Sequence, residues 1–314
     1  MLTCKSPRKV MRLAFTLGSD ALPKYFSRFS RHDFTVPQLF ACLVLKEHQR
    51  KTYRDVEALL RDAPQWCRDI GMKKVPDHNT LCRAFHALKL IRRSGRLLDK
   101  LVQWFAVARQ LGTTAALDSS HYDSRYRSRH YEQRCRHYTG TREKTPANTR
   151  RSRTARQSPK LGIGVCTRCH LILSARPRTG FGSDSPDFGP LLFDAWKRHP
   201  RLRDVLADAG YDSEGNHRIA RLDMGVRSTI KSGIGRPGKR GPSGYYRNIM
   251  SKRLKGSQRG KKYGQRAQAE TVNSMLKRNM GDALRSRSPR ARRNEQMLRV
   301  LTHNIALLCD KIEG

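Results

Sequence analysis

The pattern of apolar residues changes near Gly112, and this change most limits the folds open to the chain. Before it, apolar residues recur at helical spacing; after it, short β-compatible runs alternate with amphipathic segments. Strands that first form a hairpin and then alternate with helices indicate a mixed α/β sheet. We therefore predict a helical N-terminal region over residues 1–110 and a mixed α/β domain over residues 111–314.

The N-terminal region carries start signals for three helices. Thr35 is placed to cap a helix with Pro37 in its first turn, and Thr52 opens a capping-box pattern. Residues 76–79 end the second helix and start a third. The apolar residues that this third helix would turn inward are Leu81, Phe85, Leu88 and Ile91. Two short helices followed by a basic third are typical of a helix-turn-helix DNA reader, and an ordinary bundle with a solvated basic face has the same pattern.

Two acids follow predicted strands of the second domain. Asp118 comes directly after the apolar run 113–117, and Asp208 follows the run 203–207 in the sequence Ala-Asp-Ala-Gly-Tyr. Sheet ends of this kind often hold catalytic groups, so these two are preferred over nearby acids. The further segments that we expect are strands at 160–165, 171–175 and 226–230, and helices at 188–198 and 213–222. The acids ranked below Asp118 and Asp208 are Asp123, Asp204, Asp212 and Glu295. Glu295 lies in an expected C-terminal helix whose core residues we predict to be Met297, Val300, Leu301 and Leu308.

A long segment without acids separates these residues from a third carboxylate. Residues 224–269 contain no Asp or Glu and are rich in Lys and Arg. We predict a basic, Gly-rich insertion at about 231–262 that lies along a phosphate backbone, with a disordered basic linker as the alternative. Residues 125–160 form a second basic stretch with interleaved tyrosines, either a base-stacking surface or a solvated loop.

Glu270 ends this acid-free segment. It lies in a Pro-free run that predicts one continuous helix from Tyr263 to a stop at Gly281. Offsets of 3, 7 and 14 from Tyr263 put Arg266, Glu270 and Lys277 on one helix face. A carboxylate between cations can bind a metal while its neighbours hold DNA, but a surface ion-pair ladder has the same spacing.

The net charge limits the classes of partner that the chain can bind. The chain has 65 Lys and Arg against 26 Asp and Glu, a formal net charge of +39, which indicates a polyanionic partner such as nucleic acid. No apolar run approaches the ~20 residues that span a bilayer, and no signal-peptide pattern is present. We therefore expect a cytoplasmic protein with reduced cysteines and no membrane partner.

Taken in order, three motifs resemble one family. Asp-Ser-Ser at 118–120, Ala-Asp-Ala-Gly-Tyr at 207–211 and Tyr-x2-Arg-x3-Glu-x6-Lys at 263–277 resemble the DDE transposases of bacterial and archaeal insertion sequences. The last motif matches the Tyr-Arg-Glu-Lys signature of the insertion-sequence four and five group at every spacing. Three further segments look similar to this family: residues 36–39, 75–81 and 303–308.

This resemblance implies a ribonuclease-H-like catalytic domain that binds two Mg²⁺ ions, with Mn²⁺ able to substitute. It implies hydrolysis at the element ends, followed by attack of the freed 3′-hydroxyl on target DNA. The residues that match the metal-binding catalytic triad are Asp118, Asp208 and Glu270. Those that match the contacts to transposon-end DNA are Tyr263, Arg266 and Lys277. The implied partners are double-stranded DNA, as terminal inverted repeats and target, and further copies of the chain, in a nucleoid-associated homo-oligomer.

Two other functions fit parts of the sequence. A catalytically inactive, transposase-derived protein would bind DNA specifically without cutting it, although the three matching acids are intact. A basic RNA-binding or ribosome-associated protein would explain the charge but not the placement of those acids.

The sequence Cys166-Thr-Arg-Cys169-His170 matches a haem-attachment motif in form. It falls at the expected turn between two strands, so we predict two thiols in a turn and no haem. A zinc site completed by Cys135 and His137 is the remaining alternative.

Overall fold

A mixed sheet forms the centre of the C-terminal half of the computed structural model, which describes residues 3–29, 31–126, 159–179, 182–232, 242–255 and 261–312. Its strands are β1 (Thr114–His121), β3 (Pro159–Cys166), β4 (Ile172–Thr179), β5 (Asp204–Ala207) and β6 (Arg227–Ile230). They lie in the order β4-β3-β1-β5-β6. The pairs β1–β3 and β3–β4 are antiparallel, whereas β1–β5 and β5–β6 are parallel. The predicted mixed α/β class is confirmed.

Strand β1 runs further than its apolar residues suggest. The prediction that the strand ends before Asp118 was wrong, because residues 118–121 continue to pair with β3 up to His121. Pairing with β5 does end at Leu117, which lies opposite Ala207. Asp118 is therefore the first residue of β1 beyond the end of its parallel neighbour.

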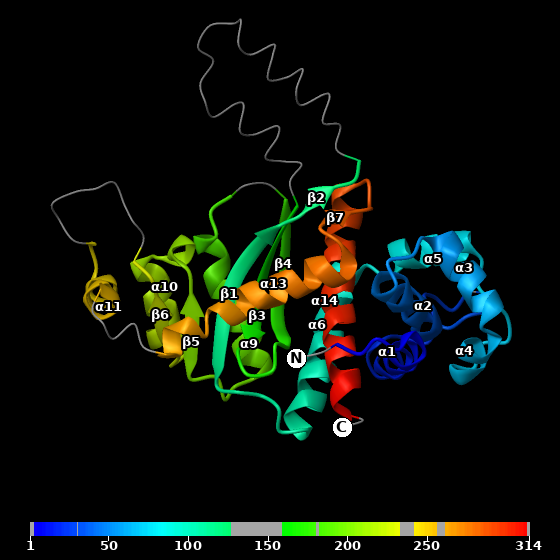
Figure 1. Ribbon diagram of the computed structural model, residues 1–314, viewed down its shortest axis with the longest axis horizontal. Coiled ribbons are helices and arrows are strands. Elements are labelled where there is room, and N and C mark those ends of the chain that lie inside the picture. Colours follow the sequence, from blue (N-terminus) through cyan, green and yellow to red (C-terminus); the bar gives the residue numbers. More distant parts are fainter. Residues whose placement is uncertain are drawn as a thin grey trace, which may run out of the picture.

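Helices cover both faces of the sheet. Helix α13 (Ala267–Met280) packs on β1 and β3, and α9 (Phe188–Arg198) packs on β1, β3 and β4 (Figure 1). Successive strand residues point to opposite faces, so Leu117 joins the apolar cluster on the α9 side. Its neighbour Ala116 belongs to the larger cluster that includes α13 residues.

The N-terminal region is helical, as predicted. Its helices are α1 (Pro7–Ala21), α2 (Val36–His48), α3 (Tyr53–Asp62), α4 (Pro64–Asp69), α5 (His78–Ala87) and α6 (Leu90–Val107). Thr35 and Thr52 both form complete capping boxes, and Asp77 caps α5. The prediction that Ile91 faces the core was wrong. Lys89 adopts a left-handed backbone (φ 44°) between α5 and α6, which changes the helix phase and leaves Ile91 42% exposed.

Helix α14 (Pro289–Ile312) connects the two halves of the chain. It lies between the sheet and helices α1–α5 and packs against α2, α6 and β4 (Figure 1). On its buried side, Asn304 accepts the N–H of Ile172 and donates to its carbonyl, both at 2.9 Å. Its side chains Met297, Val300, Leu301 and Leu308, the core residues expected of a C-terminal helix, are buried. Because one apolar cluster contains residues from both halves, the boundary near residue 110 stays a prediction.

Shorter elements complete the described chain. They are β2 (Asp123–Ser124), β7 (Ala283–Leu284), α10 (Glu214–Arg218), α11 (Tyr245–Lys255), α12 (Lys261–Gly264), the 3-10 helices η1 (Ser185–Asp187) and η2 (Ala209–Tyr211), and the π-helix η3 (Ile219–Asp223). Strands β2 and β7 form a separate parallel pair. No helix of the described residues is long and apolar enough to span a membrane.

The basic insertion predicted at 231–262 is partly helical. Residues 233–241 and 256–260 lie outside the described residues, but α11 falls between them. Glu214 anchors its start by accepting the N–H groups of Tyr246 and Arg247, and the Arg247 side chain pairs with an acid of the preceding loop. The second basic stretch lies outside the described residues from 127 to 158.

Candidate active site

Two of the predicted site residues lie at one edge of the sheet. Leu117 of β1 and Ala207 of β5 are opposite each other in a parallel pair, so Asp118 and Asp208 follow on adjacent strands. Neighbouring strands lie about 4.8 Å apart, and both acids leave at the carboxyl ends of this pair. The sequence pattern placed each acid after a strand; the structure adds that the two strands are neighbours.

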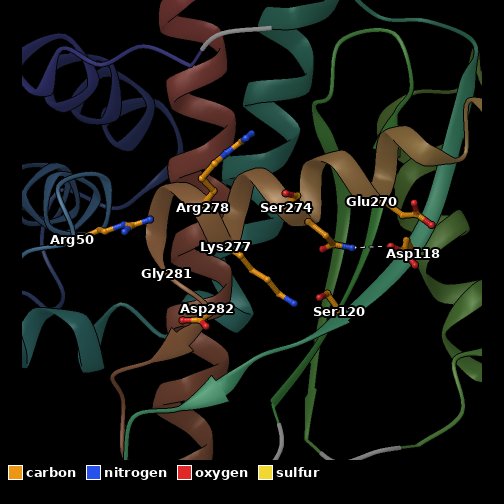
Figure 2. A pocket seen from close by; sticks show the side chains of 10 residues that line it. Arg50, Asp118, Ser120, Glu270, Ser274, Lys277, Arg278, Gly281 and Asp282 are labelled. Carbon is orange, nitrogen blue, oxygen red and sulfur yellow. Dashed lines mark hydrogen bonds between the residues drawn. The ribbon is translucent and has the colours of Figure 1, made fainter.

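Glu270 approaches Asp118 from the helix that packs on the same face of the sheet. It lies in the first turn of α13, and its carboxylate points toward that of Asp118 (Figure 2). Both border a polar groove of about 650 Å³ whose lining, among the described residues, does not include Asp208. The groove is lined by Arg50, Asp118, Ser120, Glu270, Asn273, Ser274, Lys277, Arg278, Gly281 and Asp282.

Asn273 holds the Asp118 carboxylate. Its Nδ2 donates to Asp118 Oδ2 at 3.0 Å, and its own Oδ1 is buried without a partner in the described part of the chain. Burial raises the pKa of Asp118 above its usual value, the Asn273 hydrogen bond opposes the rise, and the charge of Glu270 adds to it. Sequence reasoning missed Asn273, although its position three residues after Glu270 places it on the same helix face.

The Tyr-Arg-Glu-Lys residues do not share one helix. Helix α12 ends at Gly264, and α13 begins at Ala267, so the predicted continuous helix was wrong. Glycine is a poor helix former, and at the break the Gln265 side chain hydrogen-bonds with Thr167 at 3.1 Å. The predicted stop at Gly281 is confirmed, with φ 92°.

The break sends these side chains to different places. Tyr263 reaches the end of β5, where its hydroxyl donates to Ala207 O at 3.4 Å, next to Asp208. Arg266 pairs with Glu270 at 2.6 Å. Lys277 lies in the groove with its Nζ 5.6 Å from the Tyr122 ring centre.

The predicted metal ligands supply only oxygen atoms, the donor type that Mg²⁺ prefers. In the described ranges, no three His, Cys, Asp or Glu side chains are close enough together to hold a metal ion. Two of the predicted ligands share the groove, and Asp208 lies at the end of the adjacent strand. Arg266, beside Glu270, and Asn273, beside Asp118, now supply the positive or donor groups at the two carboxylates. The donor set fits the ion, while the side chains are not gathered around one centre.

The acids ranked below the triad have structural partners. Asp204 pairs with Arg227 at 3.0 Å and Lys262 at 2.6 Å. Asp212 pairs with Arg247 at 2.8 Å, and Asp123 accepts the N–H of its neighbour Ser124. The buried Glu295 of α14 accepts two backbone N–H groups and pairs with a neighbouring arginine. These contacts account for each of the four acids without catalysis.

Cys166 and Cys169 are buried at the β3–β4 turn, as predicted. The N–H of Gly112 donates to Cys166 Sγ at 3.3 Å, and the Cys169 thiol is the main group that lowers the pKa of Cys166. His170, in the same turn, contacts Gln268 of α13, so the turn braces the helix that carries Glu270. Cys135 and His137 lie outside the described residues, and the zinc alternative stays untested.

The mixed five-stranded sheet, with its helices on both faces, is a ribonuclease-H-like fold. The family described as "Transposase DDE domain" matches residues 114–305, from the start of β1 into α14 and across all three predicted acids. The chain belongs to this family of transposases. No curated protein and no solved structure matches the chain.

Proposed function

We propose that the chain is an insertion-sequence transposase of the four and five group. It cuts DNA at the element's ends and joins the freed 3′-hydroxyls to target DNA. The observation that carries this proposal is the convergence of Asp118 and Glu270, from β1 and α13, on one polar groove with Asp208 on the next strand. Both ends of the element must be held together, so the working form is a homo-oligomer on double-stranded DNA, associated with the nucleoid.

Asp118, Asp208 and Glu270 are the proposed ligands of Mg²⁺, or of Mn²⁺ in its place, with two ions per site. When bound, such ions stabilise the entering and leaving oxygens of an in-line phosphoryl displacement. The raised pKa of Asp118 supports this assignment, because burial and the nearby Glu270 disfavour its negative charge and a cation would favour it. The unpartnered Oδ1 of Asn273 offers a further oxygen at the same place.

The cationic and aromatic residues would hold the DNA. Lys277 in the groove neutralises a phosphate next to the carboxylates, and Arg266 is placed to exchange its pairing with Glu270 for a phosphate. Tyr263 lies beside Asp208 and offers a ring or hydroxyl to the bound strand. Water and a DNA 3′-hydroxyl are the attacking groups, so no serine or tyrosine nucleophile is required.

Two observations favour the alternative of an inactive, DNA-binding descendant. Glu270 is ion-paired with Arg266, and the three acids are not gathered around one centre. Such a protein would bind the same DNA with Lys277 and its neighbours but would not cut it, whatever metal is supplied.

A change of metal preference separates the two functions. Asp118→Cys replaces an oxygen ligand with sulfur, which Mg²⁺ binds poorly and Mn²⁺ accepts better. We expect this variant not to cut DNA from the gene's flanks in Mg²⁺ and to regain part of its cleavage in Mn²⁺. Asp223→Asn removes an exposed acid outside the groove and is the matched control, which should cut like the wild type. A wild-type protein that binds the flanks but cuts them in neither metal would establish the inactive alternative.

A further inference from the structure

The groove beside the carboxylates has one wall from the N-terminal helical region. Arg50, in the turn between α2 and α3, lines it together with Lys277 and Arg278 of α13. Figure 2 shows Arg50 pointing toward the C-terminal end of α13, while Asp118 and Glu270 lie near its other end. The groove therefore leads from the acids to a group of cations supplied by both halves of the chain.

Arg50 is held in place by contacts to the catalytic half. Its backbone is left-handed (φ 52°), a conformation that a non-glycine residue keeps only when its surroundings fix it. Arg285 donates to the carbonyls of Arg50 and Lys51, at 2.9 and 3.1 Å. The Arg50 side chain donates from Nε to Asn279 O at 2.8 Å, which aims the rest of the guanidinium along the groove.

The cations of this wall have no acidic partner in the part of the chain that the structure describes. Arg266, Arg227 and Arg247 each pair with a carboxylate, whereas Arg50 and Arg278 form no ion pair with any of the described residues. Both of these side chains are exposed. Asp282 is the acid at this end of the groove, and it opposes their positive potential.

The spacing along α13 sets the length of the surface. Ser274, Lys277, Arg278 and Gly281 follow Glu270 along the helix and line the same groove. At 1.5 Å per residue, Arg278 lies about 12 Å from Glu270 along the axis. A DNA strand advances 3.4 Å per nucleotide, so this length corresponds to about three or four nucleotides.

We propose that Arg278 and Arg50, continuing from Lys277, bind successive phosphates of the DNA strand that leaves the carboxylates toward the helical region. The turn between α2 and α3 is thereby part of the catalytic-site DNA surface. This inference rests on the proposed function and adds to it the path of the strand and the residues that fix it.

The salt dependence of binding tests the path. The probe is a duplex from the gene's flank, bound in EDTA so that no cleavage occurs. Arg278→Ala and Arg50→Asn should each lower the slope of log K against log salt by about 0.9, the value for one phosphate contact. Between 50 and 200 mM salt, the wild type should then lose about 3.5-fold more affinity than either variant. Asparagine is chosen for position 50 because it tolerates the left-handed backbone.

Control variants should strengthen DNA binding or leave its salt dependence unchanged. Asp282→Asn should bind the duplex more tightly than the wild type, because it removes the acid of this wall. Arg201→Ala removes an exposed arginine just before the N-terminal end of β5, whereas the acids lie at the C-terminal end of this strand pair. This variant should keep the wild-type slope. Arg50→Lys keeps the charge and should restore most of the slope, which excludes misfolding as the cause.

Single methylphosphonates, which remove the charge of one phosphate, locate the contacts. Arg278→Ala should no longer weaken binding when the duplex lacks the phosphate charge three or four nucleotides from the cleavage site. Arg50→Asn should no longer weaken binding when the missing charge lies further from that site. Equal losses at every phosphate, or unchanged slopes in both variants, would overturn the path. If the wild type still cuts with Mg²⁺ and Glu270→Gln does not, that result leaves the proposed function standing. A wild type that neither binds nor cuts the flanks overturns both.

Discussion

Replacement of Arg299 by methionine tests how the end of the groove is held. This α14 side chain is 1% exposed and donates to Gly281 O at 2.7 Å and to Ala283 O at 2.9 Å. It also pairs with Glu295 at 2.9 Å and approaches Glu47 of α2 at 3.5 Å. Arg299 thus ties the C-terminal helix to the helical region and to the loop that ends the groove.

Methionine keeps much of the apolar length but leaves the buried Glu295 and two carbonyls without this donor, whereas Glu47 keeps its ion pair with Lys46. Loss of one member of a buried ion pair costs about 3–5 kcal/mol, and a hydrogen bond from a charged donor contributes about 1.5–3 kcal/mol. We therefore expect Arg299→Met to lower the free energy of unfolding by about 3–5 kcal/mol, measured by urea titration. Burial raises the pKa of Glu47, but the charge of Lys46 and then that of Arg299 lower it below its usual value.

The matching control removes the acid that the substitution strands. Arg299→Met combined with Glu295→Gln should recover part of the loss, because buried pairs replaced as a unit are often near neutral. Glu47 is left unchanged, since its ion pair with the buried Lys46 at 2.7 Å remains. A single variant that loses less than about 1 kcal/mol would refute the reasoning. So would a double variant that is less stable than the single one.

Three other changes have definite outcomes. Burial raises the pKa of Asp118, so its ionised form costs folding free energy above that pKa. In urea titration at pH 8, Asp118→Asn should therefore be at least as stable as the wild type, yet it should be unable to cut DNA. Asn304→Leu leaves the N–H and carbonyl of Ile172 unpaired and should lower the free energy of unfolding by about 2–4 kcal/mol. A smaller decrease than that of Asn248→Ala, an exposed control, would contradict this prediction. Burial lowers the pKa of His303 to about 4, so between about pH 6.5 and 4 the unfolded chain takes up a proton that the folded chain does not. The free energy of unfolding should therefore fall as the pH drops through this range, and His303→Gln should flatten the decline. An equal decline in the variant would exclude His303 as its source.

Local signals in the sequence were enough for much of the fold. Capping at Thr35 and Thr52 depends on residues within one turn, and the structure forms both caps. The predicted restart at residues 76–79 is also present, with Asp77 as the cap of α5. Apolar runs also located the sheet strands, because a buried strand needs them in any context. The boundary of β1 was missed because polar residues after Leu117 pair with β3, which the run itself does not reveal.

The site depended on contacts between distant residues. At the break before α13, the Gln265 side chain hydrogen-bonds with Thr167, far earlier in the chain. Helical spacing alone could not predict this break, which removes Tyr263 from the face that Glu270 and Lys277 share. The offset of Asn273 from Glu270 was a local signal for its place on the helix face. Nothing in the local sequence indicated that its partner would be Asp118 on β1. Arg50 belongs to a basic region in which no pattern distinguishes one arginine from another; only the packing of its turn on α13 does.

The most direct test of the central claim is strand transfer. Labelled DNA from the gene's own flanks is incubated with a target plasmid and Mg²⁺, with the wild type beside Glu270→Gln. We expect the wild type to join the label to the plasmid, EDTA to stop the reaction, and Glu270→Gln to bind the DNA without joining it. Joining by Glu270→Gln at the wild-type rate, or tight binding by the wild type with no joining in any divalent metal, would contradict the account.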